Sequence, residues 1–233
     1  MSGPVFQANP RLALEGIEAV IFDLDGVVTR TAKVHAQAWQ EAFAPLPFDP
    51  VADYLRYVDG KPREDGVRSF LAARGIAAAD EEVRAIGARK NALFLERLRD
   101  GVEVYETTLA LIRALRRRGV RTALVTASRN ADAVLQAAGI HDLFDARVDG
   151  NDAARLGLAG KPAPDTFLHA AEALGVAPAR AAVVEDALAG VEAGRAGGFG
   201  AVIGVDRAGQ AEALREHGAT LVVGDLGELE RAA

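Results

Sequence analysis

The sequence predicts an α/β fold, in which a parallel sheet is covered by helices on both faces and a helical domain is inserted after the first strand. Three observations support this prediction. Short apolar runs recur along the chain, segments with helical spacing lie between most of them, and one long stretch has helical segments without an apolar strand. Alternation of strand and helix is typical of a parallel sheet, because each crossover connection must be long enough to hold a helix.

The predicted strands are apolar runs of four or five residues that end abruptly in polar residues. Runs of this length and composition are typical of parallel strands that are buried on both faces. They lie at residues 19–22, 122–125, 181–184, 201–205 and 220–223.

The helices between the strands are predicted from the spacing of their apolar residues and from the glycines that follow them. The apolar residues of 109–115 lie on one helical face, and the segment stops at Gly119. Segments that stop at Gly139 and Gly175 follow the same pattern. Glycine just after the last apolar position is a helix stop signal.

The alternation of strands and helices is interrupted between residues 30 and 103. This stretch has helical segments at 33–43, 63–74 and 81–99 and no comparable apolar strand. We therefore predict two domains. The catalytic core comprises residues 1–29 and 104–233, and residues 30–103 form an inserted helical domain, called the cap below.

Composition excludes several classes of function. The net charge of −6 does not favour binding to nucleic acid, and the lack of cysteine excludes a thiol nucleophile or a thiolate metal site. Residues 1–19 lack the pattern of a signal peptide, and no apolar run approaches the length of a membrane span. The sequence therefore predicts a cytoplasmic protein, expected to be a monomer, with neither nucleic acid nor a membrane as partner.

Polar residues that can carry chemistry follow three of the predicted strands. Ligands of open α/β sheets bind outside the carboxyl ends of the strands, so these residues are expected to converge. They are Asp23, Asp25 and Gly26 after the first strand, Thr126, Ser128, Arg129 and Asn130 after the second, and Glu185 and Asp186 after the third, with Lys161 in a segment that returns to the same edge.

This set of residues meets the requirements of phosphoryl transfer. Asp23 and Asp186 are hard oxygen ligands of the kind that Mg²⁺ prefers. Asp23 can attack phosphorus and form an aspartyl phosphate, while Asp25, two residues along an extended segment, can act as the general acid and base. Thr126 can hydrogen-bond a phosphoryl oxygen, and Lys161 can offset the remaining negative charge.

Four motifs resemble those of the haloacid dehalogenase superfamily, in the order found in that family, and the likeness covers nearly the whole chain. They are Phe22-Asp23-Leu24-Asp25-Gly26-Val27-Val28, Val125-Thr126-Ala127-Ser128, Gly160-Lys161-Pro162 and Val184-Glu185-Asp186. The resemblance implies a Rossmann-like core with a cap of four or five helices. It also implies Mg²⁺ as cofactor, bound by Asp23, the backbone carbonyl of Asp25, and Asp186 with Glu185 close by.

Further residues resemble the β-phosphoglucomutase-like branch of that superfamily. They are His35 and Trp39, the run Gly60-Lys61-Pro62-Arg63-Glu64-Asp65, the run Ser128-Arg129-Asn130, and the pair Lys90-Asn91. The resemblance implies a substrate-binding role for His35, Trp39, Gly60, Arg63, Ser128, Arg129 and Asn130. Arg63 would grip the phosphate that is not being transferred, because a guanidinium binds phosphate in a bidentate manner.

The branch resemblance implies a mutase that interconverts β-glucose 1-phosphate and glucose 6-phosphate, with a small phosphorylated sugar as substrate. Two residues depart from the pattern of the branch: Arg30 stands where many members have an acid, and Asp59 where a basic residue is found. Asp59 beside Arg63 could weaken a second phosphate site.

Three other functions stay open. A sugar-phosphate phosphatase would use the same nucleophile with water as acceptor. A phospho-accepting signalling module also places an aspartate, a hydroxyl residue and a lysine at strand ends. A catalytically silent binding protein could retain the fold.

The candidate residues also have purely structural interpretations. The aspartates, Glu185, Thr126 and Ser128 could cap helices or turns, Lys161 and Arg63 could be solvated, His35 could be an ordinary cap-helix residue, and Trp39 could pack in a core.

Overall fold

The computed structural model describes residues 14–230 and contains one parallel sheet within them. Its six strands are β1 (Ala19–Phe22), β2 (Arg121–Val125), β3 (Ala146–Val148), β4 (Ala181–Glu185), β5 (Ala201–Val205) and β6 (Leu221–Val223). Their order is β3-β2-β1-β4-β5-β6, with β1 between β2 and β4. The predicted α/β fold class is confirmed, although residues 1–13 and 231–233 of the predicted core lie outside the described residues.

The five predicted strands are present with ends that differ by at most one residue, and β3 is an additional strand at the edge of the sheet. β3 has only three residues, with Arg147 at its centre, so its composition did not distinguish it from a loop. It pairs with β2 in parallel from Ala146 to Val148.

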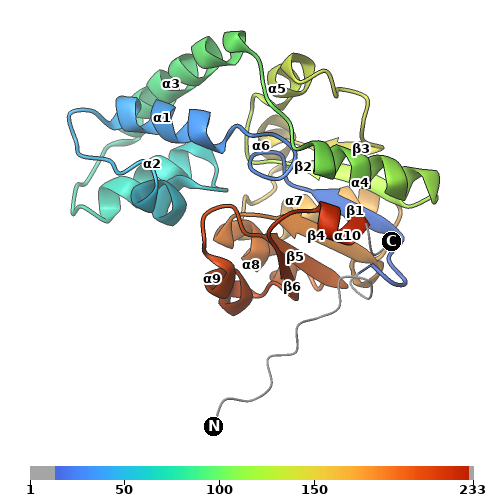
Figure 1. Cartoon of the computed structure of the whole chain (residues 1–233). Coiled ribbons are helices and arrows are strands. Elements are labelled where there is room, and N and C mark those ends of the chain that lie inside the picture. The colour runs from blue at the N-terminus through green and yellow to red at the C-terminus, as the bar shows by residue number, and fades with distance from the viewer. Residues whose placement is uncertain (1–13, 231–233) are drawn as a thin grey trace.

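Helices cover both faces of the sheet (Figure 1). α4 (Glu106–Arg117), α5 (Ala131–Ala137) and α10 (Gly227–Glu230) supply residues to one hydrophobic cluster, and α7 (Asp165–Ala173), α8 (Leu188–Ala196) and α9 (Ala211–His217) supply the other. α6 (Gly150–Leu156) follows β3, and a short 3-10 turn (Pro178–Arg180) precedes β4. Because side chains alternate along a strand, Val20 and Phe22 face the first cluster while Ala19 and Ile21 face the second.

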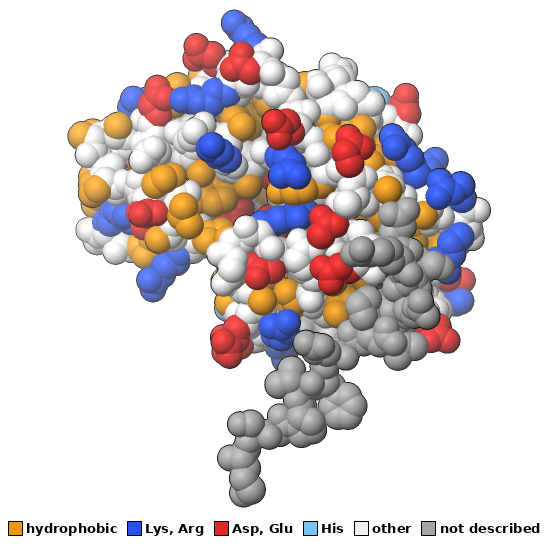
Figure 2. Space-filling model, in the orientation of Figure 1, with side chains coloured by type: hydrophobic (Ala, Val, Ile, Leu, Met, Phe, Trp, Pro, Cys, Tyr) orange, Lys and Arg blue, Asp and Glu red, His pale blue; other side chains and the backbone are white. Residues whose placement is uncertain are grey.

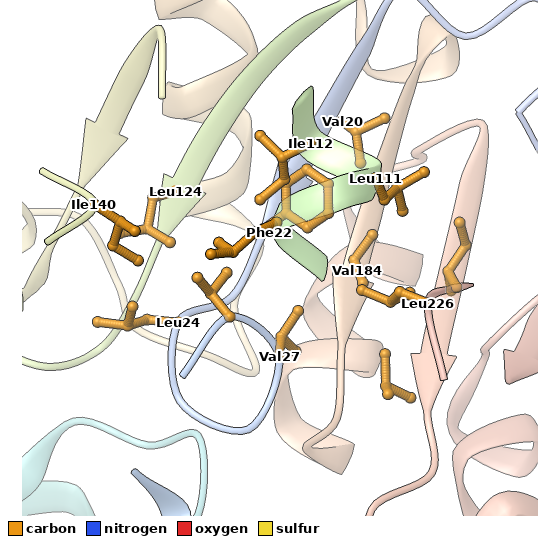
Figure 3. Packing of buried hydrophobic residues seen from close by; sticks show 14 of the residues in the cluster. Val20, Phe22, Leu24, Val27, Leu111, Ile112, Leu124, Ile140, Val184 and Leu226 are labelled. Carbon is orange, nitrogen blue, oxygen red and sulfur yellow. The ribbon is translucent and has the colours of Figure 1, made fainter. Parts of the chain in front are cut away.

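Phe22 lies in the middle of the first cluster, between β1 and α4 (Figure 3). Leu111 and Ile112 of α4 pack over it, and all three side chains are fully buried. Full burial of a large apolar side chain stabilises a fold by roughly 1.5–3 kcal/mol. The strand that carries the nucleophile candidate Asp23 is therefore anchored immediately before that residue.

The cap contains α1 (Ala32–Phe43), a π-helix (Tyr54–Val58), α2 (Arg63–Ala72), α3 (Asp80–Arg97) and a 3-10 turn (Leu98–Asp100). Figure 1 shows α1, α2 and α3 grouped together beside the sheet. Aromatic and aliphatic residues of the cap, including Trp39, Phe43 and Phe70, form a third hydrophobic cluster of their own. The division into core and cap stays a prediction, which this separate cluster supports.

The chain passes between the sheet and the cap twice, and the two passages pair with each other. Thr29 forms an antiparallel bridge with Val104. The backbone N–H of Arg30 donates to the carbonyl of Glu103 at 2.8 Å, and that of Tyr105 donates to the carbonyl of Val28 at 3.0 Å. Both passages therefore form one short two-stranded connection, called the hinge below.

The surface carries charges of both signs. Figure 2 shows acidic and basic side chains interspersed over one face, with Lys and Arg gathered at the edge where α4 lies. Arg113, Arg116 and Arg117 of α4 are exposed. Between residues 14 and 230, none of the helices has the length and hydropathy required to span a membrane.

Candidate active site

A cavity of about 470 Å³ lies between the cap and the carboxyl ends of β1, β2 and β4. The predicted residues that it brings together come from four separate segments of the core and two of the cap. Those that line it are Asp23, Asp25, His35, Trp39, Gly60, Arg63, Thr126, Ser128, Arg129, Asn130, Lys161 and Asp186. Glu185, the remaining predicted residue, is fully buried next to them.

Asp23 is fixed by its position directly after β1. Its backbone N–H donates to the carbonyl of Val184 at 3.0 Å, which continues the pairing of β1 with β4. The ammonium group of Lys161 donates to Asp23 Oδ1 and, at 2.5 Å, to Glu185 Oε1. Glu185 Oε2 accepts from the backbone N–H of Ala187 at 2.8 Å. Lys161 is therefore not solvated but joins two buried carboxylates.

Asp23, Glu185 and Asp186 fit a divalent cation. One carboxylate oxygen from each lies within 4.8 Å of the others, and all three residues are buried. Burial raises the pKa of Asp23 well above its usual range, as do the charges of Glu185 and Asp25, although Lys161 acts in the opposite direction. Burial and neighbouring carboxylates likewise raise the pKa of Asp186. A cation among these oxygens would offset the repulsion between them.

Gly26 brings the turn after Asp25 against Asp186. Its φ of +87° lies in the left-handed region, and a Cβ at this position would overlap the Asp186 carboxylate. Only glycine combines this backbone conformation with so close an approach. The turn thereby places the backbone of residues 25–26 beside the carboxylate cluster.

Asp25 is held by two cap residues. The hydroxyl of Thr31 donates to Asp25 Oδ1, and Nε2 of His35 lies 3.2 Å from the same oxygen. Burial alone would raise the pKa of Asp25, but the charge of His35 and hydrogen bonds from His35 and Thr31 lower it to about 2. Asp25 is thus a carboxylate at neutral pH, and its side chain faces the cap side of the cavity.

His35 is linked in turn to a buried lysine of α3. Nζ of Lys90 lies 2.5 Å from Nδ1 of His35 and 5.1 Å from the centre of the Trp39 ring. Burial lowers the pKa of Lys90 to about 7, while Asp25 acts to raise it and Arg63 to lower it. Trp39 packs in the cap cluster and also lines the cavity, and its substrate-binding role stays a prediction.

A second cationic group, Arg63 with Arg129, lies on the same cavity. Nη2 of Arg63 donates to Asn91 Oδ1 at 2.7 Å, and the same oxygen accepts from the side-chain amide of Asn130 at 2.7 Å. Asn91 therefore joins Arg63 of the cap to Asn130 of the core. Burial lowers the pKa of Arg63, and the positive charge of Arg129 adds to the effect. Both guanidinium groups line the cavity, and their positive charge favours an anion there.

The loop after β2 presents Thr126, Ser128 and Asn130 from one compact turn. The hydroxyl of Thr126 accepts from the backbone N–H of Ser128 at 3.1 Å, and that of Ser128 accepts from the N–H of Asn130 at 3.1 Å. These two hydroxyls thus stabilise the turn, as the structural interpretation proposed, and they also line the cavity.

Two residues at the cavity and one behind it were given no role by the motifs. Tyr54 of the π-helix and Lys90 of α3 line the cavity, and Thr31, just before α1, contacts Asp25. Lys90 was noted only as one half of the pair Lys90-Asn91. A signal was present at Lys90, because it interrupts the apolar face of α3 between Val83 and Phe94.

The two residues that depart from the branch pattern lie in different places. The guanidinium of Arg30 lies at the hinge, 4.3 Å from the centre of the Tyr105 ring, and Arg30 is not among the cavity residues. Asp59 does line the cavity. The departure at Arg30 therefore concerns the hinge, whereas the departure at Asp59 concerns the site.

Comparisons with known proteins agree with this architecture. The haloacid dehalogenase-like hydrolase family matches residues 17–198. A β-phosphoglucomutase of Mycobacterium tuberculosis is 46% identical over 92% of both chains, and one of Bacillus subtilis is 35% identical over 91% of this chain and 92% of its own. The crystal structure of a β-phosphoglucomutase from Clostridium difficile superimposes with a TM-score of 0.80 at 28% identity, covering 91% of this chain and 93% of the other.

Proposed function

The chain belongs to the haloacid dehalogenase-like hydrolase family, in its β-phosphoglucomutase-like branch, and we propose that it interconverts β-glucose 1-phosphate and glucose 6-phosphate. It is a phosphoryl-transfer enzyme. The observation that carries the mutase proposal is the position of Arg63 on the cavity, held by Asn91 and accompanied by Arg129. A mutase passes through a sugar bisphosphate, so one phosphate must be held while the other reacts.

Asp23 is the proposed nucleophile. One of its carboxylate oxygens attacks phosphorus, the phosphorus–oxygen bond to the sugar breaks, and an aspartyl phosphate forms. Asp23, Asp186 and the backbone carbonyl of Asp25, with Glu185 close by, would hold Mg²⁺, and the ion would supply positive charge for the phosphoryl oxygens. Lys161 supplies further positive charge, and Thr126 donates a hydrogen bond to a phosphoryl oxygen.

Asp25 is the proposed acid and base. Its carboxylate form fits the step in which a sugar hydroxyl attacks the phosphorylated Asp23, because Asp25 can take the proton from that hydroxyl. In the reverse direction the protonated Asp25 returns the proton to the leaving oxygen. Thr31 and His35 orient the carboxylate for both steps.

A phosphatase is the second candidate, since water could replace the sugar hydroxyl as acceptor with the same Asp23 and Asp25. A signalling module is disfavoured by the cavity beneath the cap and by Asp25, neither of which a receiver needs. Mutase and phosphatase differ in whether the second phosphate is held, so products distinguish them.

The decisive experiment follows phosphorus by NMR. The protein is incubated with Mg²⁺, a trace of hexose bisphosphate and β-glucose 1-phosphate. Glucose 6-phosphate without inorganic phosphate is the expected result. Inorganic phosphate alone would overturn the mutase in favour of the phosphatase. The Asp23→Ala variant is the control and should form neither product.

Replacement of Arg63 tests the second phosphate site directly. Arg63→Ala should lower kcat/KM for isomerisation by on the order of 10²-fold, because it removes charge-assisted hydrogen bonds worth roughly 1.5–3 kcal/mol each. Hydrolysis of a small monophosphate should change far less. The matched control is Arg68→Ala, which removes an exposed cap arginine paired with Asp80. Equal losses in both reactions would show that Arg63 holds no second phosphate.

A further inference from the structure

Asp59 is a cap carboxylate that lines the cavity together with Asp25 and Asp186. It follows the π-helix that contains Tyr54, and its backbone N–H donates to the carbonyl of Tyr54 at 3.0 Å. The next residue, Gly60, lies against Ala187, directly after Asp186, so the backbone of Asp59 lies at the end of the cavity where phosphoryl transfer is proposed.

Gly60 fixes the distance between Asp59 and the core. Its φ is +68°, and a Cβ at Gly60 would lie 2.9 Å from the Cβ of Ala187, directly after Asp186. A side chain there would push the cap away from the core. The glycine thus allows Asp59 to lie against the proposed reaction centre.

The surroundings of Asp59 define what it can bind. Burial, with the charges of Glu185 and Asp25, raises the pKa of Asp59 to about 7, and in its carboxylate form Asp59 has only acceptor oxygens. The buried Tyr54 also lines the cavity. Asp23, Asp25 and Asp186 line the same cavity, and Lys161 is already joined to Asp23 and Glu185. The substrate group that complements the Asp59 oxygens is therefore neutral and donates a hydrogen bond.

We propose that Asp59 is a specificity-determining residue that accepts a hydrogen bond from a sugar-ring hydroxyl near the reacting phosphate. The proposal rests on the proposed phosphosugar function and narrows its substrate class. The substrate must carry a free hydroxyl there, so deoxy sugars and phosphates with an added carboxylate at this point are rejected. A site built to hydrogen-bond a hydroxyl discriminates strongly, because its polar group is left unpaired by the analogue that lacks it.

The test compares kcat/KM for β-glucose 1-phosphate with its 2-deoxy, 3-deoxy and 4-deoxy analogues. In the wild type, one analogue should be poorer by roughly ten- to hundredfold, the range for a hydrogen bond to a charged group. Asp59→Ala should lower kcat/KM for the parent sugar by about the same factor. For that one analogue, kcat/KM of Asp59→Ala should equal that of the wild type. Asp59→Asn, which keeps an acceptor oxygen and the side-chain size, should show an intermediate loss. It also serves as the informative variant should Asp59→Ala not fold.

Total product is counted as sugar 6-phosphate plus inorganic phosphate, so the result does not depend on the acceptor. The matched control is Asp80→Asn, an exposed cap carboxylate paired with Arg68, which should keep the wild-type ratios. If Asp59→Ala lowers kcat/KM by the same factor for all three deoxy analogues as for the parent sugar, Asp59 does not bind any of these hydroxyls. That result would overturn the role of Asp59 and leave the proposed function intact. Failure of the wild type to turn over any of these sugars would overturn both.

Discussion

Lys90 shows how one buried side chain can link the cap to the proposed acid and base. Its ammonium group lies next to His35, and His35 lies next to Asp25, so three titratable groups form a chain from α3 to the reaction centre. Burial lowers the pKa of His35, and the charge of Lys90 lowers it further. A change of charge on Lys90 therefore acts on the orientation and the charge state of the groups that hold Asp25.

The lowered pKa of Lys90 predicts a pH-dependent contribution to stability. An unfolded lysine has a pKa of about 10.4, whereas folding lowers that of Lys90 to about 7. Between these values the unfolded chain binds more protons than the folded one, so stability rises with pH. Compared with Lys90→Met, the wild type should gain up to about 1.4 kcal/mol per pH unit between pH 7 and 9, measured by urea unfolding.

The control for this measurement is Lys33→Met, which removes an exposed lysine of α1 and should show no such difference. If the wild type loses stability relative to Lys90→Met as pH rises over the same range, the pKa of Lys90 is not lowered. The direction of the pKa shift alone decides whether stability rises or falls with pH.

Residues of the site differ in how far the sequence could predict them. Asp23 and Asp186 were predicted because each directly follows a strand of a parallel sheet, and topology alone brings such strand ends together. Lys161 was predicted from a segment between two strands that returns to the same edge. Lys90 and Tyr54 were not, because they reach the cavity from cap helices whose packing angle no local pattern specifies. The role of Asp59 also depends on this packing, which the glycine at position 60 permits.

At the scale of elements, the hinge is tied to the catalytic turn by stacked side chains. The ring of Tyr105 lies between two guanidinium groups, that of Arg30 at 4.3 Å and that of Arg207 at 3.7 Å from the ring centre. Nε of Arg207 also donates to the carbonyl of Gly26 at 2.9 Å. Arg207, in the loop after β5, thus contacts both the hinge and the turn that carries Asp25.

We expect Arg207→Ala to affect turnover more than substrate affinity. The variant loses a cation–π contact and a hydrogen bond to the Gly26 carbonyl, which together should cost about 1–3 kcal/mol of the free energy of unfolding. The turn that carries Asp25 is then held less rigidly. We therefore expect kcat to fall while KM changes little. Steady-state kinetics and urea unfolding measure the two effects.

Arg215→Ala, an exposed position on α9, is the control for loss of an arginine. Arg207→Lys should recover part of kcat, because it restores the positive charge over Tyr105. An unchanged kcat in Arg207→Ala would show that the turn is held without this contact.

Elements also differ in how well the sequence predicted them. The five buried strands and the main helices were found because burial on both faces or on one stripe leaves a clear apolar pattern. β3 was missed because an edge strand of three residues has little to bury. The cap helices were predicted in place, but the five-residue π-helix was not, since its hydrogen-bond pattern leaves no spacing of its own over a single turn.

At the scale of the whole molecule, the cap lies closed against the core. Pro62 of the cap lies so close to Gly160 of the core that a Cβ at Gly160 would overlap its ring, and Asn91 bonds Asn130 across the same gap. Glu64 and Arg129 add an ion pair at 3.7 Å between half-exposed side chains. Separation of these contacts would widen the entrance to the cavity, and the hinge is the connection about which the cap can move.

The closed cavity also concentrates carboxylates, which predicts that Mg²⁺ stabilises the whole fold. Burial raises the pKa values of Asp23 and Asp186, so without a cation the folded chain binds more protons than the unfolded chain above about pH 4. Stability without Mg²⁺ should therefore fall as pH rises through this window. A cation that binds only the folded state adds about 2.7 kcal/mol at one hundred times its Kd.

For a chain of this size, that gain corresponds to a rise in Tm of roughly 5–10 °C. The rise should be larger at pH 7.5 than at pH 5, because protonated carboxyls bind the cation poorly. Differential scanning calorimetry with and without Mg²⁺ measures both values. Asp186→Asn should lose the rise, and without Mg²⁺ it should be more stable than the wild type, because one of the repelling charges is gone. If the Tm of the wild type at pH 7.5 is the same with and without Mg²⁺, there is no cation site at these carboxylates, whatever the enzyme's substrate.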